Sequence, residues 1–195
     1  MKRNPFNLVW QTLILSLLVI GSTSCSKDND NDDPKVEVNN ELTYKGQTYD
    51  LNIGAFNDYG FEDGYSNIEF SIFHLVSESD PIIPVFLYLD LYSTNQDIES
   101  GTYRFSDAET DGDGNTFSDS YLVRNYYWQE DKGDEVATIA GGTVKLSRDG
   151  ENFKFEFDLV TDKNEKIQGS YGGKFEDITG QISAKRIGLP NIKTR

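Results

Sequence analysis

Residues 152–159 alternate strictly between polar and apolar side chains, and this pattern confines them to a half-buried β-strand. One face of such a strand carries only apolar side chains: Phe153, Phe155, Phe157 and Leu159. The other face carries only polar ones, among them Lys154, Glu156 and Asp158. A period of two with one apolar face is typical of an antiparallel sheet packed against a core. The same period prevails from about Glu41 onward, so we expect an all-β domain without helices.

Turn residues separate the alternating segments. Asp149-Gly150 joins Thr143–Ser147 to the strand at 152–159, and an Asp-Gly pair between two alternating runs predicts a β-hairpin. Lys45-Gly46 predicts a second tight turn. The further strands that we expect are Leu42–Tyr44, Gln47–Leu51, Ser66–Leu75, Val85–Tyr92, Gly101–Phe105, Ser120–Trp128, a segment through Ile167 and Tyr171, and a weaker one at Gln181–Arg186.

These segments predict nine to ten strands in a single domain over residues 41–187, followed by a tail at 188–195. Phe and Tyr occur 12 and 11 times in the chain while Met and His occur once each, a composition that favours β-structure. Both an antiparallel sandwich and a flattened β-barrel, calycin-like or lipocalin-like, would bury this pattern. The sequence lacks the pairing information that would decide between them.

The amino terminus has the pattern of an export signal. A basic start at Lys2 and Arg3 precedes a short apolar run, Leu8–Ile20, and the small residues Gly21 to Ser24. Because a membrane span needs about 20 apolar residues, this run is too short to be one. We therefore interpret residues 1–24 as a signal peptide and expect the remainder to be a soluble domain.

Cys25 is the only cysteine and follows the small residues directly, so no internal disulfide can form. The segment resembles a lipobox, although Ser22 stands where an aliphatic residue is usual. The resemblance implies a lipoprotein signal peptide and a lipid on Cys25 that anchors the chain to a membrane. The alternative is an ordinary secreted protein with an accidental cysteine.

Residues 25–40 are acidic and carry few apolar side chains, which predicts a disordered tether. The run from Lys27 to Asp33 is similar to the export signal of surface-exposed lipoproteins of Bacteroidetes. This resemblance implies an outer-membrane, lipid-anchored protein at the cell surface.

A second resemblance concerns the domain itself. Three glycine-containing motifs, Gly101-Thr102-Tyr103, Gly142-Thr143-Val144 and Gly169-Ser170-Tyr171-Gly172-Gly173, are similar to those of small β-domain lipoproteins of Bacteroidetes. The resemblance spans about Glu41 to Phe175 and rests on turn glycines and core aromatics. It implies a fold and a compartment, and it brings no catalytic residue.

The charge of the domain excludes one class of partner. Removal of residues 1–24 takes away two basic residues and no acid, which leaves a formal charge of −17. Binding to phosphate backbones depends on Lys and Arg, so we expect no nucleic-acid partner. Anionic lipid surfaces are disfavoured for the same reason.

The aromatic side chains are the best candidates for ligand binding. In Val85–Tyr92, one face is aliphatic and the other carries Tyr88, Asp90 and Tyr92. Tyr126 and Trp128 share a face further along, and Tyr59 lies in a Gly-rich segment, 56–65, that we interpret as a loop. Rings with polar tips suit sugars and peptides. The alternative, which the sequence favours, is that these rings fill a core.

One acidic segment has oxygen donors at the spacing of a calcium loop: Asp107, Glu109, Asp111, Asp113 and Asn115. An EF-hand would need a bidentate Glu where Ser118 stands, and we expect no flanking helices. The favoured interpretation is an acidic connection between strands, with weak calcium binding as the alternative and no other cofactor.

The sequence gives little support to catalysis. His74 is the only histidine and we expect it on the apolar face of its strand, so a nucleophilic triad is disfavoured and a His/Cys zinc site is excluded. Asp90 and Glu135 are the carboxylates that could serve a glycosidase. We therefore expect a non-catalytic module that binds a glycan or a protein partner. The alternatives are an accessory subunit of an outer-membrane complex and a carboxylate-dependent glycoside hydrolase.

Overall fold

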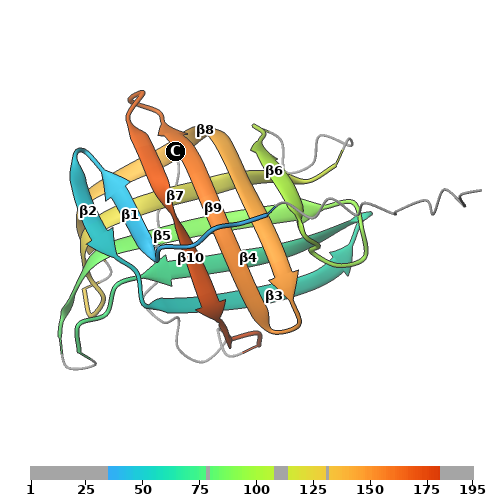
Figure 1. Cartoon of the computed structure of the whole chain (residues 1–195), viewed down its shortest axis with the longest axis horizontal. Helices are drawn as coiled ribbons and strands as arrows, with labels where there is room; N and C mark the ends of the chain where they lie inside the picture. Colours follow the sequence, from blue (N-terminus) through green and yellow to red (C-terminus); the bar gives the residue numbers. More distant parts are fainter. Residues whose placement is uncertain (1–34, 78–79, 108–113, 131, 181–195) are drawn as a thin grey trace, which may run out of the picture. The chain divides into compact units, whose positions relative to one another are not determined.

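A computed structural model describes residues 35–77, 80–107, 114–130 and 132–180, which form one mostly antiparallel sheet (Figure 1). The described part is all-β, and the sheet is not closed into a barrel. Its strands are β1 (Glu41–Tyr44), β2 (Gln47–Asp50), β3 (Ile53–Glu62), β4 (Tyr65–Phe73), β5 (Ile82–Ser93), β6 (Gly101–Phe105), β7 (Thr116–Tyr127), β8 (Lys132–Asp149), β9 (Asn152–Thr161), β10 (Lys166–Lys174) and β11 (Glu176–Asp177). Among these residues, no helix is long and apolar enough to span a membrane.

Strand β8 links the two halves of the sheet. One half contains β11, β3, β4, β5 and β7, and the other contains β6, β9, β10, β1 and β2. The order is β11-β3-β4-β5-β7-β6-β8-β9-β10-β1-β2, with an additional β7–β8 pairing. The first part of β8 pairs with β7 and the second part with β6 and β9, and the register shifts between Ile139 and Gly141. At the next residue, Gly142, φ is +108° and a Cβ would lie 2.2 Å from the Asp158 carbonyl oxygen. Only glycine fits this bend.

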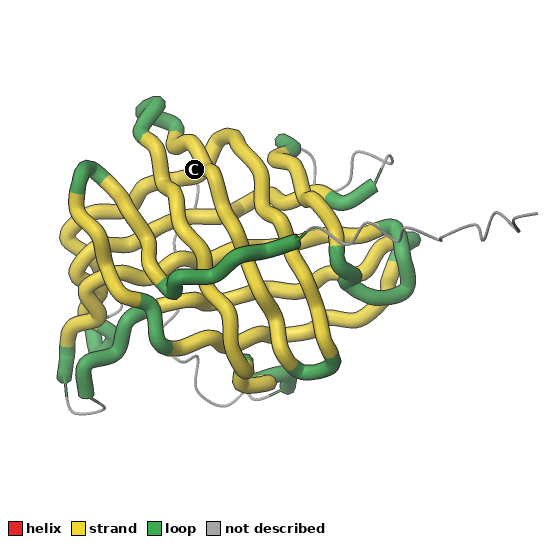
Figure 2. Tube along the Cα trace, viewed as in Figure 1, coloured by secondary structure: helices red, strands yellow, loops and turns green. Residues whose placement is uncertain are grey.

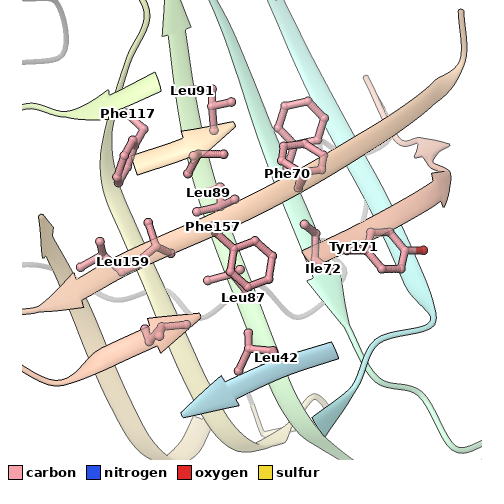
Figure 3. Close-up of a cluster of buried hydrophobic side chains, with 14 of the residues drawn as sticks. Leu42, Phe70, Ile72, Leu87, Leu89, Leu91, Phe117, Phe157, Leu159 and Tyr171 are labelled. Atoms are coloured by element: carbon pink, nitrogen blue, oxygen red, sulfur yellow. The ribbon is translucent and has the colours of Figure 1, made fainter. Parts of the chain in front are cut away.

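Because of this bend, the strands of one half cross those of the other at a steep angle (Figure 2). The apolar faces of the two halves meet in an aromatic core. The Phe70 ring of β4 lies 5.2 Å from the Phe153 ring and 4.9 Å from the Phe155 ring of β9. These strands are not neighbours in the sheet, so the contacts are made between its two halves. Figure 3 shows Phe70, Leu87 and Phe157 gathered in this core.

The alternation of β9 is confirmed. The four predicted inward side chains, Phe153, Phe155, Phe157 and Leu159, are at most 1% exposed. The hairpin at Asp149-Gly150 is also confirmed, since β8 and β9 pair directly up to Asp149 and Asn152, and Gly150 has a φ of +61°. Lys45 and Gly46 both adopt positive φ between β1 and β2, as the predicted tight turn requires.

A charged network joins the halves at one end of the sheet. The Tyr44 hydroxyl of β1 lies within hydrogen-bond distance of Glu135 of β8 (3.0 Å) and of Glu165 in the β9–β10 turn (2.6 Å), and its one proton is shared between the two carboxylates. Lys45 and Arg124 form salt bridges with Glu135. The hydrogen bond from Lys45, with further help from Tyr44, lowers the pKa of Glu135. This network fixes the β1–β2 hairpin against β7 and β8.

The prediction of a loop at 56–65 was wrong, because most of this segment belongs to β3. Gly60 and a run of acids hide the alternation there, and the register shifts between Asp58 and Gly60, as in a β-bulge. The sequence also missed β11 and the first half of β8. The described residues alone therefore form eleven strands rather than nine or ten, and Gln181–Arg186 lies outside them.

The ring contacts predict a large cost for opening the core. Phe70→Ala should lower the free energy of unfolding by about 3–5 kcal/mol, because it removes a fully buried ring from between the two halves. Urea denaturation measures this difference. Phe61→Ala is the matched control: Phe61 is 48% exposed, and its loss should cost less than about 0.5 kcal/mol. Equal losses in the two variants would contradict this account of the core.

Candidate functional site

The face of β4 and β5 that points away from the core carries a dense group of tyrosines and carboxylates. Alternation sends Leu87, Leu89 and Leu91 into the core, so Tyr88, Asp90 and Tyr92 point the other way. We call this surface the tyrosine face and define it by Asn57, Tyr59, Asn67, Glu69, Tyr88, Asp90, Tyr92, Thr116, Ser118 and Tyr121. Tyr88, Asp90 and Tyr92 are each only 7% exposed although they lie outside the main core.

Asp90 lies at the centre of the tyrosine face. Its carboxylate accepts hydrogen bonds from the Tyr92 hydroxyl (2.8 Å) and from the Asn67 side-chain amide. Its backbone N–H donates to Ser120 Oγ at 3.0 Å. On β4, Glu69 is the direct cross-strand partner of Asp90, and side chains in such positions have Cβ atoms about 5 Å apart. The two carboxylates are therefore neighbours on one face.

Burial raises the pKa of Asp90 from 3.8 to about 7. The negative charges of Glu69 and Asp119 act in the same direction, while the hydrogen bonds from Tyr92 and Asn67 oppose the shift. Asp90 consequently changes its protonation state near neutral pH. A carboxyl group that does so is a marker of functional sites, although structural networks produce such shifts as well.

Glu69 is half-buried and interacts with uncharged donors. The Asn57 amide lies 3.5 Å from Glu69 Oε2. Burial, followed by the interaction with Glu69, raises the pKa of Tyr59 to about 12. The pKa of Tyr88 is raised by burial first and then by the charges of Asp90 and Glu69. The two tyrosine hydroxyls therefore stay protonated at neutral pH and can donate to this carboxylate.

Two hydroxyl groups on the same face have no hydrogen-bond partner among the described residues. Ser118 Oγ and Thr116 Oγ1 are both unpaired, and their residues are 5% and 7% exposed. Ser118 is the cross-strand partner of Asp90 and Thr116 that of Tyr92. A buried polar atom without a partner costs free energy, so these positions need a specific explanation.

Further along the strands the tyrosine face gives way to an apolar cluster. Ile83, Phe86, Tyr88, Val123 and Tyr126 pack together there. The Tyr88 ring stacks on Tyr121 with centroids 4.8 Å apart and planes at 16°. Val136, which pairs with Val123 across β7 and β8, is 37% exposed. The outward surface is thus polar at one end and apolar at the other.

The structure brings together only some of the predicted ligand residues. Tyr59, Tyr88 and Tyr92 all lie around Glu69 and Asp90. Tyr126 is 2% exposed within the apolar cluster, and Trp128 is 40% exposed with its Nε1–H bonded to the Asp80 carbonyl oxygen. Tyr126 therefore does not form an exposed platform with Trp128. Glu69 and Ser118 could not be predicted as neighbours of Asp90 from the sequence, because only the strand register places them beside it.

Three of the five calcium candidates, Glu109, Asp111 and Asp113, lie outside the described residues. Cys25 also lies outside them. Of the remaining two, Asp107 is exposed and Asn115 accepts a hydrogen bond from Ser93 Oγ at 2.8 Å. Within the described ranges, no group of three or more His, Cys, Asp or Glu side chains could hold a metal ion.

The two carboxylates considered for glycosidase chemistry are not a pair. Asp90 is on the outward face of β5, whereas Glu135 belongs to the charged network with Tyr44 and Lys45. His74 follows β4 rather than continuing its apolar face; it is half-buried, and its Nδ1 has no hydrogen-bond partner.

A separate cavity of about 340 Å³ lies near the β8–β9 turn. Phe56, Phe153 and Phe175 contribute apolar lining, and charged side chains, including Arg148 and Glu151, line the remainder. Arg148 already donates to two backbone carbonyl groups and lies over the Phe153 ring. The guanidinium group of Arg148 is therefore already partnered within the protein.

Comparisons with protein families, with curated proteins and with solved structures find no match to this chain. The site must therefore be interpreted from its own chemistry.

The raised pKa of Asp90 predicts how stability depends on pH. As pH rises above 4, the unfolded chain releases this proton first, so the folded state loses stability until Asp90 itself ionises near pH 7. Between pH 5 and 8 this loss amounts to about 3 kcal/mol. Asp90→Asn should remove it, and urea denaturation at the two pH values measures it. Asp158→Asn, which removes an exposed carboxylate from β9, should keep the wild-type dependence, and the same dependence in Asp90→Asn would disprove the shift.

Proposed function

We propose that this protein is a lipid-anchored, non-catalytic binding module at the outer surface of the outer membrane, and that it binds a glycan or a protein partner through the tyrosine face. The export signal and Cys25 support the anchor, and the resemblance to surface lipoproteins of Bacteroidetes supports the location. For the fold, we propose an open, flattened relative of the calycin-type barrel.

The observation that carries this proposal is the combination of exposed and unsatisfied groups around Glu69. Tyr59 is 55% exposed and Glu69 is half-buried, so both are open to an approaching molecule. Ser118 Oγ and Thr116 Oγ1 lie deeper on the same face and lack partners. Rings with hydroxyl tips beside carboxylate acceptors can contact both the apolar and the polar parts of a ligand.

A second candidate is an accessory subunit docked on an outer-membrane complex. It is favoured by the apolar end of the outward surface, where Val136 is 37% exposed, and by Trp128, which directly follows β7 and is 40% exposed. Exposed apolar side chains that gather on one face mark protein interfaces.

A hydrolase is a third candidate, favoured by the direct pairing of Glu69 with Asp90 and by the pKa of Asp90. Retaining glycosidases hold two carboxyl groups about 5–5.5 Å apart. Both Asp90 oxygens, however, already accept hydrogen bonds from Tyr92 and Asn67. Asp90 is also only 7% exposed, so binding is the function that this geometry supports better.

The proposal is tested by screening the full chain against immobilised glycans and against purified outer-membrane proteins. We expect at least one ligand whose affinity falls about tenfold or more in Tyr59→Ala, which is the effect of losing one well-placed aromatic contact. Turnover of a bound glycan that disappears in Glu69→Gln would favour the hydrolase instead.

Trp128→Ala is the matched control, because it removes another exposed aromatic side chain from the far end of β7. We expect it to leave the affinity within about twofold of the wild type, as for a residue outside the contact region. A loss in Trp128→Ala alone would move the site to the apolar end and support the accessory-subunit interpretation.

A further inference from the structure

Glu69 and Asp90 face each other without a cation between them. They are cross-strand partners on β4 and β5, and in the part of the chain that the structure describes neither forms a salt bridge with a Lys, Arg or His side chain. When both groups are ionised, like charges directly opposite each other in a sheet destabilise it. A positive group bound at this position would remove that repulsion.

Elsewhere in the sheet, two cross-strand acids lie opposite a cation. Glu156 on β9 pairs with Lys145 on β8, with Nζ and Oε1 2.7 Å apart. Glu135 on β8 pairs with Arg124 on β7 at 3.2 Å. Glu41 and Asp50 also lie opposite each other, and among the described residues neither forms a salt bridge, but Asp50 is exposed to solvent. The tyrosine face differs because Asp90 is only 7% exposed.

The unpartnered hydroxyl groups are an independent sign of a ligand. Ser118 is 95% buried, pairs directly with Asp90, and its Oγ has no hydrogen-bond partner. Thr116 is the cross-strand partner of Tyr92, and its Oγ1 also lacks a hydrogen-bond partner among the described residues. Each oxygen has free lone pairs, so a donor that reaches Asp90 would find acceptors on its β7 side as well.

Tyrosine rings flank the two carboxylates. Tyr88 and Tyr121 stack with centroids 4.8 Å apart, and Tyr65 meets the edge of Tyr92 at 5.6 Å. The faces of such rings attract organic cations. A metal ion is a poorer fit, since Glu69 and Asp90 have no third His, Cys, Asp or Glu ligand among the described residues.

From these observations we infer that the tyrosine face takes a cationic side chain, Lys or Arg, of a protein partner against the half-buried Glu69, with the nearly buried Asp90 beside it. The inference rests on the proposed binding function and names the chemistry of the partner. The face continues into the apolar cluster with exposed Val136, and an apolar region beside a charged contact is typical of protein interfaces. The formal charge of −15 for the whole chain also attracts basic partners.

The test measures binding of fluorescein-labelled hexalysine to the full chain by anisotropy, with acetylated hexalysine as the uncharged comparison. The double variant Glu69→Gln/Asp90→Asn should weaken binding about tenfold or more, because it removes the charge-assisted hydrogen bonds. Glu156→Gln/Asp158→Asn removes two carboxylates from β9 and changes the net charge almost equally at pH 8, where Asp90 is ionised and the comparison is made. It should stay within about twofold of the wild type, since those groups lie outside the site.

If the first double variant does not fold, Glu69→Gln alone is compared with Glu156→Gln, because both side chains are only half-buried. Equal weakening in the two variants would show non-specific attraction and overturn the inference. Preferential binding of hexaglucosamine over hexalysine would assign the amine to a glycan and also overturn it. If hexalysine does not bind but Tyr59→Ala still lowers affinity for a ligand from the screen, the inference fails and the proposed function stands.

Discussion

The bend of β8 at Gly142 is the constraint on which the rest of the structure depends. A side chain at this position would collide with the backbone of β9, so the strand can change partners from β7 to β6 and β9 only with glycine here. The bend places the apolar face of β9 against that of β4, where Phe70, Phe153 and Phe155 form the core. Without it, the two halves of the sheet could not share one core.

This arrangement leaves the other face of β4 and β5 free for a second purpose. Leu87, Leu89 and Leu91 supply the contacts of β5 with the core. The residues that alternate with them, Tyr88, Asp90 and Tyr92, therefore do not pack in that core. A face selected only for solubility would carry exposed charges. This face instead holds a nearly buried carboxylate, a neighbouring acid and two unpaired hydroxyl groups. Such local conflicts with stability are typical of positions kept for function.

The sequence predicted what depends on local pattern. The alternation of β9, the Asp149-Gly150 hairpin and the all-β class follow from side-chain period and turn chemistry, and the structure confirms them. The difference between the two faces of β5 could also be predicted, because leucines alternate with tyrosines and Asp90 along this segment. The strand β3 was missed because Gly60 and its acidic neighbours interrupt the pattern at a bulge.

The candidate site could be predicted only in part, because it depends on register. Tyr59, Tyr88 and Tyr92 were singled out by residue type, but Glu69 and Ser118 become partners of Asp90 only through the pairing of β4, β5 and β7. No short sequence pattern indicates which residues of these three strands lie opposite one another. For the same reason Trp128 and Tyr126 looked like neighbours on one face, whereas the structure buries Tyr126 and leaves Trp128 exposed.

The central claim is that the outward face of β5 holds a buried carboxyl group in a site rather than an ordinary surface acid. A carbon-13 NMR titration of the Asp and Glu carboxyl groups tests it most directly, because each group reports its own pKa. The account predicts that Asp90 titrates near pH 7 and that its signal moves when Glu69 is changed to Gln. Titration of Asp90 near its ordinary value of 3.8, unaffected by Glu69, would contradict the account.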